Sequence, residues 1–187
     1  MLKLVITKRT DVRLLERMIN HYSKPKGFVG RNICYAVTFN NDYYGHIVGG
    51  SASLHLPGRD EFINQENLNQ VVNNVFYSVS KVNNQYPTRN FTTLVIKKFM
   101  GCITKDWFLK YGDNVVGFET LVEPPRTGDL YKKAGWVLVG TTKGFTCKRQ
   151  AGTGTDGWSG KRVWDTVNLR PKLVFCFKNK RKINEVE

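Results

Sequence analysis

The chain has 187 residues, of which 41% are hydrophobic and 12% aromatic, enough for one compact domain with a core and too few for two ordinary domains. This composition argues against a disordered chain, and no apolar run approaches the roughly 20 residues of a membrane-spanning helix. The formal net charge of +14 predicts a surface that attracts polyanions, of which nucleic acid is the commonest in a cytosol.

The first half of the chain predicts a strand, a helix and a hairpin. Residues 2–6 alternate and are β-branched, and Asp11 can cap the helix that follows. After the Pro/Gly connection 23–30, a strand over 34–39 turns back at 40–42 into a glycine-rich strand over 43–54. Missing side chains on the return strand admit another backbone or a ligand, and a bulge is the alternative.

The second half alternates predicted strands and helices. Residues 62–70 have helix-compatible spacing, 71–79 form a buried strand, and the apolar spacing of 91–111 predicts the longest helix, ended by Gly112. A strand over 115–122, a diproline, a short helix over 129–134 and a strand over 136–139 follow. We expect a single domain over 1–187, with a basic glycine-rich loop and a C-terminal strand at 145–187.

Several common chemistries lack their motifs. The four cysteines lie far apart without a C-x-x-C pair, so we expect neither disulfides nor a structural metal. There is no G-x-x-x-x-G-K-[ST], G-x-S-x-G or H-E-x-x-H, and His21, His46 and His55 stand alone. Nucleotide hydrolysis, serine hydrolysis and zinc chemistry are therefore disfavoured.

The segment DLYKKAGWVLVG at 129–140 resembles the L-Y-x-x-x-G-F-x-x-x-G signature of GNAT acyltransferases. The resemblance implies an α/β (α+β) fold with a central mixed, mostly antiparallel twisted sheet flanked by helices. By position it makes Tyr131 the general acid that protonates a departing thiolate, and a core tyrosine is the alternative. The family's glycine-rich pyrophosphate loop is replaced by YPTRNF at 86–91, which does not support coenzyme A, although a helix start can still hold an anion.

Residues 118–144 are also similar to the Mom family of phage DNA adenine-modification proteins. The likeness rests on an acidic residue before proline, then Gly, Tyr, Ala, Trp and Gly-Thr, and it extends to Asn73-Asn74, Asn90 and the segment 164–173. It implies conversion of adenine in duplex DNA to its N6-carbamoylmethyl form, in the cytoplasm of a bacterial host cell, as protection from restriction. A Druantia-type defence family shares much of the pattern, including 58–60.

This chemistry needs an unstacked base, a proton acceptor and an acid. Glu123 matches the acidic position before proline and is the candidate base, with Glu119 second; an exposed charge at the turn is the alternative. Candidate donor-binding residues are those that can pair with a phosphate or lie at a helix start that holds one: Arg89, Asn90, Arg126 and Thr127. Residues expected near the cleft are His46, Ser51, Ser53, Asn73 and Asn74. Candidate nucleic-acid-binding residues combine basic and aromatic side chains: Lys148, Arg149, Trp158, Lys161, Arg162, Trp164 and Arg170.

The expected cofactor is an activated acyl donor. The implied adduct contains the atoms of glycinamide, so one hypothesis is glycyl transfer from glycyl-tRNA followed by rearrangement; acetyl-CoA is the alternative donor. The expected partners are double-stranded DNA and tRNA, with no membrane, and the oligomeric state is left between monomer and homodimer. Two other functions stay open: an acetyl-CoA-dependent N-acetyltransferase, and a non-catalytic DNA-binding defence protein of the Druantia type.

Overall fold

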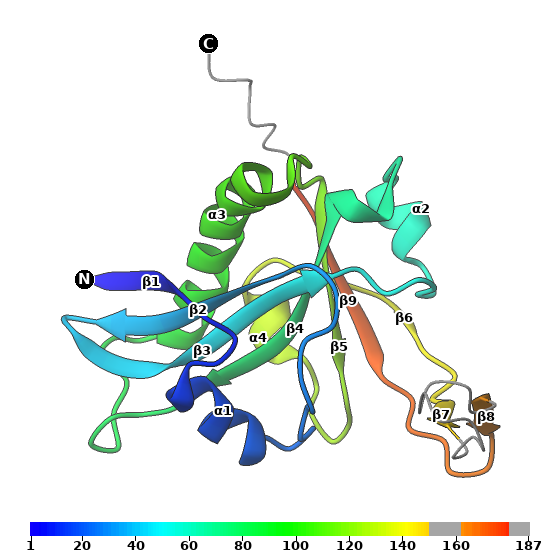
Figure 1. Ribbon diagram of the computed structural model, residues 1–187, viewed down its shortest axis with the longest axis horizontal. Helices are drawn as coiled ribbons and strands as arrows, with labels where there is room; N and C mark the ends of the chain where they lie inside the picture. The colour runs from blue at the N-terminus through cyan, green and yellow to red at the C-terminus, as the bar shows by residue number, and fades with distance from the viewer. Residues whose placement is uncertain (150–161, 180–187) are drawn as a thin grey trace, which may run out of the picture.

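The computed structural model describes residues 1–149 and 162–179 (Figure 1). Its strands are β1 (Leu2–Thr7), β2 (Asn32–Phe39), β3 (Asp42–Ser51), β4 (Val71–Val79), β5 (Gly117–Val122), β6 (Val137–Thr141), β7 (Thr146–Arg149), β8 (Arg162–Asp165) and β9 (Leu173–Lys178). Seven of them form one sheet in the order β1-β2-β3-β4-β5-β9-β6, while β7 and β8 pair as a separate ribbon. Among the strands that the structure describes, β4 and β5 alone run parallel, so the sheet is mixed and mostly antiparallel.

Helices cover both faces of this sheet (Figure 1). They are α1 (Val12–Ile19), α2 (Arg59–Ile63), the 3-10 turn η1 (Leu68–Gln70), α3 (Phe91–Tyr111) and α4 (Asp129–Lys133). On one face α1 buries Leu14 and Met18 against Phe76 of β4. On the other face α3 and α4 cover the main core, which includes Phe99 and Tyr131. None of the helices in the described ranges is long and apolar enough to cross a membrane.

The glycine-rich strand β3 lets α3 approach the sheet closely. A Cβ atom added at Gly49 would lie 2.0 Å from Cδ1 of Ile103 and 2.9 Å from Cγ1 of Val72. The missing side chain therefore admits a helix, as one interpretation of this strand expected. The same point carries a register shift against β4, so the bulge expected as an alternative is present as well.

The parallel pair β4 and β5 is short, and this places an opening in the sheet. Ladder partners run only from Val71 with Gly117 to Asn73 with Glu119. Beyond that point β5 stays paired with β9 and β4 with β3. Within β4, Val75 is the extra residue of a β-bulge, because Asn74 pairs with Gly49 and Phe76 already pairs with Val48. The bulge bends β4 where the two strands part.

Two local expectations differ from the structure. The helix expected over 62–70 is replaced by α2 and η1, because Asn64 adopts a left-handed conformation, with φ of 55°, and ends α2. The β7–β8 ribbon was not expected, and the glycine-rich stretch 152–160 lies outside the described residues. The other helices and strands match the expected segments to within a few residues at their ends.

Candidate active site

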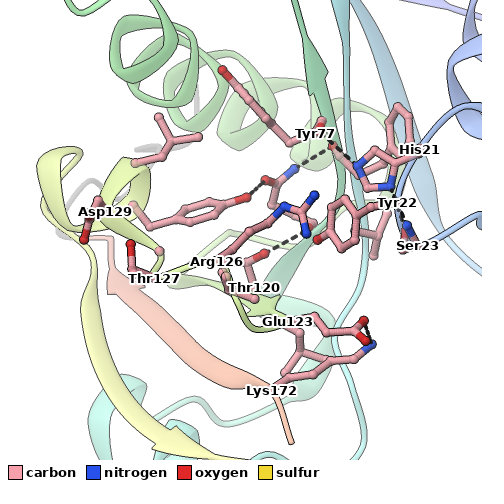
Figure 2. Close-up of a pocket in the computed structure, with 18 of the residues that line it drawn as sticks. His21, Tyr22, Ser23, Tyr77, Thr120, Glu123, Arg126, Thr127, Asp129 and Lys172 are labelled. Carbon is pink, nitrogen blue, oxygen red and sulfur yellow. Dashed lines mark hydrogen bonds and ion pairs between the residues drawn. The ribbon is translucent and has the colours of Figure 1, made fainter. Parts of the chain in front are cut away.

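A cleft of about 620 Å³ opens where β4 and β5 part. Its lining comes from four parts of the chain: residues 73–77 of β4, 120–123 and 125–131 from β5 to α4, 21–23 after α1, and Lys172 before β9. Figure 2 shows these segments converging from both sides of the strands. The cleft is therefore built by residues far apart in the sequence.

Tyr131 of α4 forms part of the cleft wall. Its hydroxyl donates to Oδ1 of Asn74 over 2.7 Å, and its ring stacks on Phe175, with ring centroids 6.1 Å apart. The side chain is 8% exposed, and burial raises the pKa of the Tyr131 hydroxyl above its ordinary value. Tyr131 thus holds its proton at neutral pH, and in this structure that proton lies in the hydrogen bond to Asn74.

Asn74 fixes both the tyrosine and the bulge. Its side-chain amide donates to the backbone carbonyls of Val48 and Phe76, and the backbone carbonyl of Asn74 accepts a bond from the Thr120 hydroxyl. The last contact holds β4 and β5 together one residue beyond the end of their ladder. These buried bonds satisfy the polar atoms of Asn74 and give the cleft floor a defined shape.

The segment after α1 supplies the opposite wall. His21 lies over β4, with its ring 4.7 Å from that of Phe76, and Nε2 lies 3.3 Å from the backbone oxygen of Tyr77. Nδ1 lies 2.7 Å from Oγ of Ser23. Burial lowers the pKa of His21, and the nearby Arg126 guanidinium adds to that shift. The imidazole is therefore neutral at pH 7.

Charged side chains gather at the same end of the cleft. Cζ of Arg126 lies 3.4 Å from the centroid of the Tyr22 ring, a cation–π contact that Figure 2 shows across the cleft. Nζ of Lys172 lies 3.8 Å from Oε2 of Glu123, and both side chains are partly exposed. This end of the cleft can orient a polar or charged acceptor.

The structure brings together only some of the predicted site residues. Those that line the cleft are Tyr131, Glu123, Arg126, Thr127, Asn73 and Asn74. Arg89 and Asn90 lie outside this lining, at the start of α3, where both are exposed. Their assignment to a donor stays a prediction.

Glu119 is not in the cleft, which corrects its placement as a second catalytic base. Its carboxylate lies 2.9 Å from NH1 of Arg59, and both side chains are fully buried. The other carboxylate oxygen accepts a bond from the backbone N–H of Ser53 over 2.6 Å. The residue neutralises a buried guanidinium beneath α2, where no substrate can reach it.

His46, Ser51 and Ser53 also lie outside the cleft lining, contrary to expectation. His46 is fully buried near the start of α1, with Nδ1 2.6 Å from the Tyr43 hydroxyl. The Ser51 hydroxyl accepts from the backbone of Arg31, and the Ser53 hydroxyl accepts from Asn73. His46 is thus enclosed by its neighbours, whereas Ser51 is exposed at the end of β3, outside the cleft lining.

The predicted nucleic-acid-binding residues are only partly described. Lys148 and Arg149 belong to β7, and Arg162 and Trp164 to β8, while Trp158 and Lys161 lie outside the described residues. Exposed Arg170 lies in the return to β9, and its N–H donates to the Gly144 carbonyl. Arg170 is outside the lining of the cleft.

Sequence reasoning missed the wall formed by His21, Tyr22 and Ser23, and it also missed Lys172. The available signal was the triplet His-Tyr-Ser directly after an amphipathic helix, in which histidine and serine are close enough to bond. The triplet becomes part of a cleft only because the loop after β5, distant in the sequence, lies against it in the fold. For Lys172 the sequence offered no signal.

Comparison with solved structures identifies the fold. The chain superposes on an acetyltransferase from Bacillus subtilis bound to CoA, with a TM-score of 0.59, 12% identity and coverage of 96% of this chain and 99% of that one. A GNAT family acetyltransferase from Elizabethkingia anophelis with acetyl-CoA bound gives a TM-score of 0.55 and 11% identity, with coverage of 95% of this chain and 98% of that one. An aminoglycoside acetyltransferase in complex with coenzyme A and kanamycin gives a TM-score of 0.56 and 14% identity, with coverage of 96% of each chain. The chain therefore has the GNAT acyltransferase fold, as expected.

Sequence comparisons identify no family for the chain. No protein-family model matches the chain, and no curated protein matches it significantly. The likeness to the Mom family consequently stays a resemblance.

The donor implied by this fold, an acyl-coenzyme A, can be tested against the residues present. Helix α3 has 21 residues and begins after Asn90, and among the described residues no side chain caps its first turn. Exposed Arg89 lies two residues before the first residue of this helix. Residues 80–90 contain no glycine, and Pro87 lacks an N–H, so the loop offers fewer backbone donors than a glycine-rich one. Arg89 and the first amides of α3 are the groups that would hold the phosphates of such a donor.

Proposed function

We propose that the protein is an N-acyltransferase that moves an acyl group from a coenzyme A thioester to an amine. The observation that carries the proposal is the cleft between β4 and β5, with the protonated Tyr131 hydroxyl on its wall 2.7 Å from Asn74. The GNAT fold and the bulge at Val75 support it. The +14 charge suits a donor that carries phosphates.

The chain's own residues divide this reaction between two walls. Coenzyme A would supply the activated acyl group and, as leaving group, a thiolate. Arg89 and the first amides of α3 would hold its phosphates. Tyr131 holds a proton for the departing sulfur, and Asn74 keeps the hydroxyl at the cleft until it is needed. Arg126 and Glu123 would orient the acceptor at the other end.

Transfer of labelled acetate from acetyl-CoA tests the proposal, with small primary amines and a DNA duplex as acceptors. Replacing Tyr131→Phe should lower kcat by about 100-fold or more while leaving coenzyme A affinity nearly unchanged. Tyr35→Phe is the matched control, because it removes a buried hydroxyl bond of 2.7 Å, to Asp106, outside the cleft. Equal rates for Tyr131→Phe and the wild type would contradict the proposed role.

The β7–β8 ribbon favours DNA as a second candidate acceptor. The two strands carry Lys148, Arg149 and Arg162 in their sequences, and a concentration of basic residues favours a polyanionic partner. A two-stranded ribbon also fits the major groove of B-DNA. The proposed acceptor would be adenine, with N6-carbamoylmethyladenine as the product and an acyl donor that extends to glycyl-tRNA.

Two measurements separate this candidate from its alternatives. Duplex binding that weakens steeply with salt, and less so after Arg149→Ala with Arg162→Ala, would support DNA as partner. Mass spectrometry of nucleosides after incubation with labelled acetyl-CoA or glycyl-tRNA would then identify any adduct. Tight binding without an adduct would favour a non-catalytic DNA-binding protein of the Druantia type.

A further inference from the structure

The wall that faces Tyr131 contains a hydroxyl and an imidazole in hydrogen-bond contact. Ser23 is exposed at the cleft, and its Oγ lies 2.7 Å from Nδ1 of the half-buried His21 (Figure 2). Both residues line the cleft and come from one short segment after α1. We propose that Ser23 and His21 form a relay that removes the proton from the acceptor amine, an inference that rests on the proposed acyl transfer.

The hydrogen bonds define which nitrogen of His21 carries the proton. The backbone N–H of Ser23 donates to Nδ1 over 3.3 Å, so Nδ1 presents its lone pair. Nε2 then carries the hydrogen and donates to the Tyr77 carbonyl. Because Nε2 is bonded to the strand, the basic nitrogen Nδ1 can exchange a proton with the cleft only through the Ser23 hydroxyl.

The surroundings keep the imidazole neutral and fixed. The ring lies against Phe76 and Tyr22, with centroids 4.7 and 4.3 Å away. The charged groups facing this end of the cleft are Arg126 and the ion pair of Glu123 with Lys172. Burial and, to a lesser degree, Arg126 lower the pKa of His21, and the hydrogen bond from Nε2 to the Tyr77 carbonyl of β4 opposes that shift while it anchors the ring. A neutral imidazole can accept a proton.

The proposed step balances. As the amine nitrogen bonds to the acyl carbon, its proton passes to Ser23 Oγ, while the Ser23 proton passes to Nδ1 of His21. The carbon–sulfur bond breaks, and the sulfur takes the proton of Tyr131. The products are an amide and a thiol; solvent then takes the His21 proton and restores that of Tyr131.

Glu123 is the competing base, since it was expected from the sequence and lines the same end of the cleft. Its carboxylate is already paired with Lys172, and the backbone carbonyl of Glu123 closes the turn to Arg126. The geometry points instead to a role in orienting the acceptor. Comparing variants of Glu123 and His21 therefore decides between the two.

Nitrogen NMR of the labelled full-length protein tests the ground state of the relay without any substrate. His21 should show an unprotonated Nδ1 and a protonated Nε2 at pH 7, and Ser23→Ala should shift the Nδ1 resonance. His55→Gln alters an exposed histidine outside the cleft lining, so it should leave the His21 resonances unchanged and serves as the control. A proton on Nδ1 would overturn the relay even if the protein transfers acyl groups.

Kinetics with acetyl-CoA and glycinamide as the probe amine test the step itself. His21→Gln should lower kcat by about 100-fold and remove the fall in rate that the wild type shows as pH drops through the His21 pKa. Ser23→Ala should lower kcat by about 10-fold and Ser23→Thr by less than about 3-fold, because threonine keeps the hydroxyl. His55→Gln should match the wild type.

Two results would overturn the inference in different ways. If the wild type transfers acetate and His21→Gln keeps its rate and pH profile while Glu123→Gln loses them, the base is Glu123 and the proposed function stands. If the wild type neither binds acetyl-CoA nor transfers acetate, the proposed function and the relay fail together. Thermal unfolding of each variant separates these outcomes from a loss of fold.

Discussion

Arg59 and Glu119 form a charged pair in the interior of the molecule. Both side chains are fully buried, and the guanidinium also donates to the backbone carbonyls of Ser53 and Leu54. Without Glu119 the buried guanidinium would keep only Asp60, whose carboxylate lies 2.7 Å from Nε of Arg59 and is 63% exposed. Losing the buried partner of a buried charge is more costly than replacing both by apolar groups. The pair therefore belongs to the stability of the fold.

Replacing Glu119→Gln should lower the free energy of unfolding by about 3–5 kcal/mol, measured by urea denaturation. The double variant Arg59→Met with Glu119→Leu should recover most of that loss. A Glu119→Gln protein with normal stability and a selective loss of acyl transfer would contradict the structural role.

His46 makes stability depend on pH. Burial lowers the pKa of His46 from its ordinary 6.5 to about 4, while the unfolded chain keeps the ordinary value. Between these values only the unfolded state takes up the proton, so stability is full above pH 6.5 and falls as the pH drops toward 4. The contribution lost amounts to about 3 kcal/mol. The free energy of unfolding, measured by denaturation, should therefore depend less on pH for His46→Gln than for the wild type. His55→Gln is the control. Parallel pH profiles for His46→Gln and the wild type would refute this role.

At this scale, the sequence predicted the type of a functional residue better than its surroundings. Tyr131 and Glu123 were singled out, and both line the cleft, because the motif that carries them is local. Glu119 was misplaced, since its partner Arg59 is 60 residues away and nothing local marks a buried ion pair. His21 was set aside as a lone histidine for the same reason.

Helix α4 is short, and its position depends on the residue before it. Gly128 has φ of 73°, and a Cβ atom there would lie 2.2 Å from the Phe175 ring of β9. An L side chain is strained in this conformation and would also collide with a rigid ring. The start of α4, and with it the direction of Tyr131, is set by this glycine.

Replacing Gly128→Ala should therefore destabilise the protein by about 1–3 kcal/mol and displace Tyr131 from Asn74. Acyl transfer should fall further than stability alone explains, when both are measured at a temperature where the variant is folded. Gly101→Ala is the control, because a Cβ at that helical position would meet no atom within 4 Å. An unchanged rate for Gly128→Ala would argue against this positioning.

Elements with strong periodicity were predicted well. Strand β4 and helix α3 have the expected bounds, since a β-branched run and a long apolar stripe are both local signals. The segment 62–70 failed because a single left-handed asparagine divides it. The bulge at Val75, the feature that bends β4 at the cleft, emerges only from pairing with β3 and could not be inferred from β4 alone.

Across the whole molecule, the fold could be expected from one local signature and the order of elements, and the GNAT neighbours confirm it. The acceptor could not be inferred in the same way, because the cleft mouth joins four distant segments and its charges become visible only when they meet. Net charge indicates the sign of a partner and leaves its chemistry to the site. That cleft, open between β4 and β5, is the feature on which the proposed function depends.

Hydrogen exchange measured by mass spectrometry, with and without coenzyme A, tests this claim most directly. Coenzyme A should slow exchange in peptides that cover 73–79 and 120–131, and at the start of α3, while the paired strands β1 and β2 remain unchanged. Protection confined to other parts of the chain, or none at saturating coenzyme A, would contradict an acyl-donor site in this cleft.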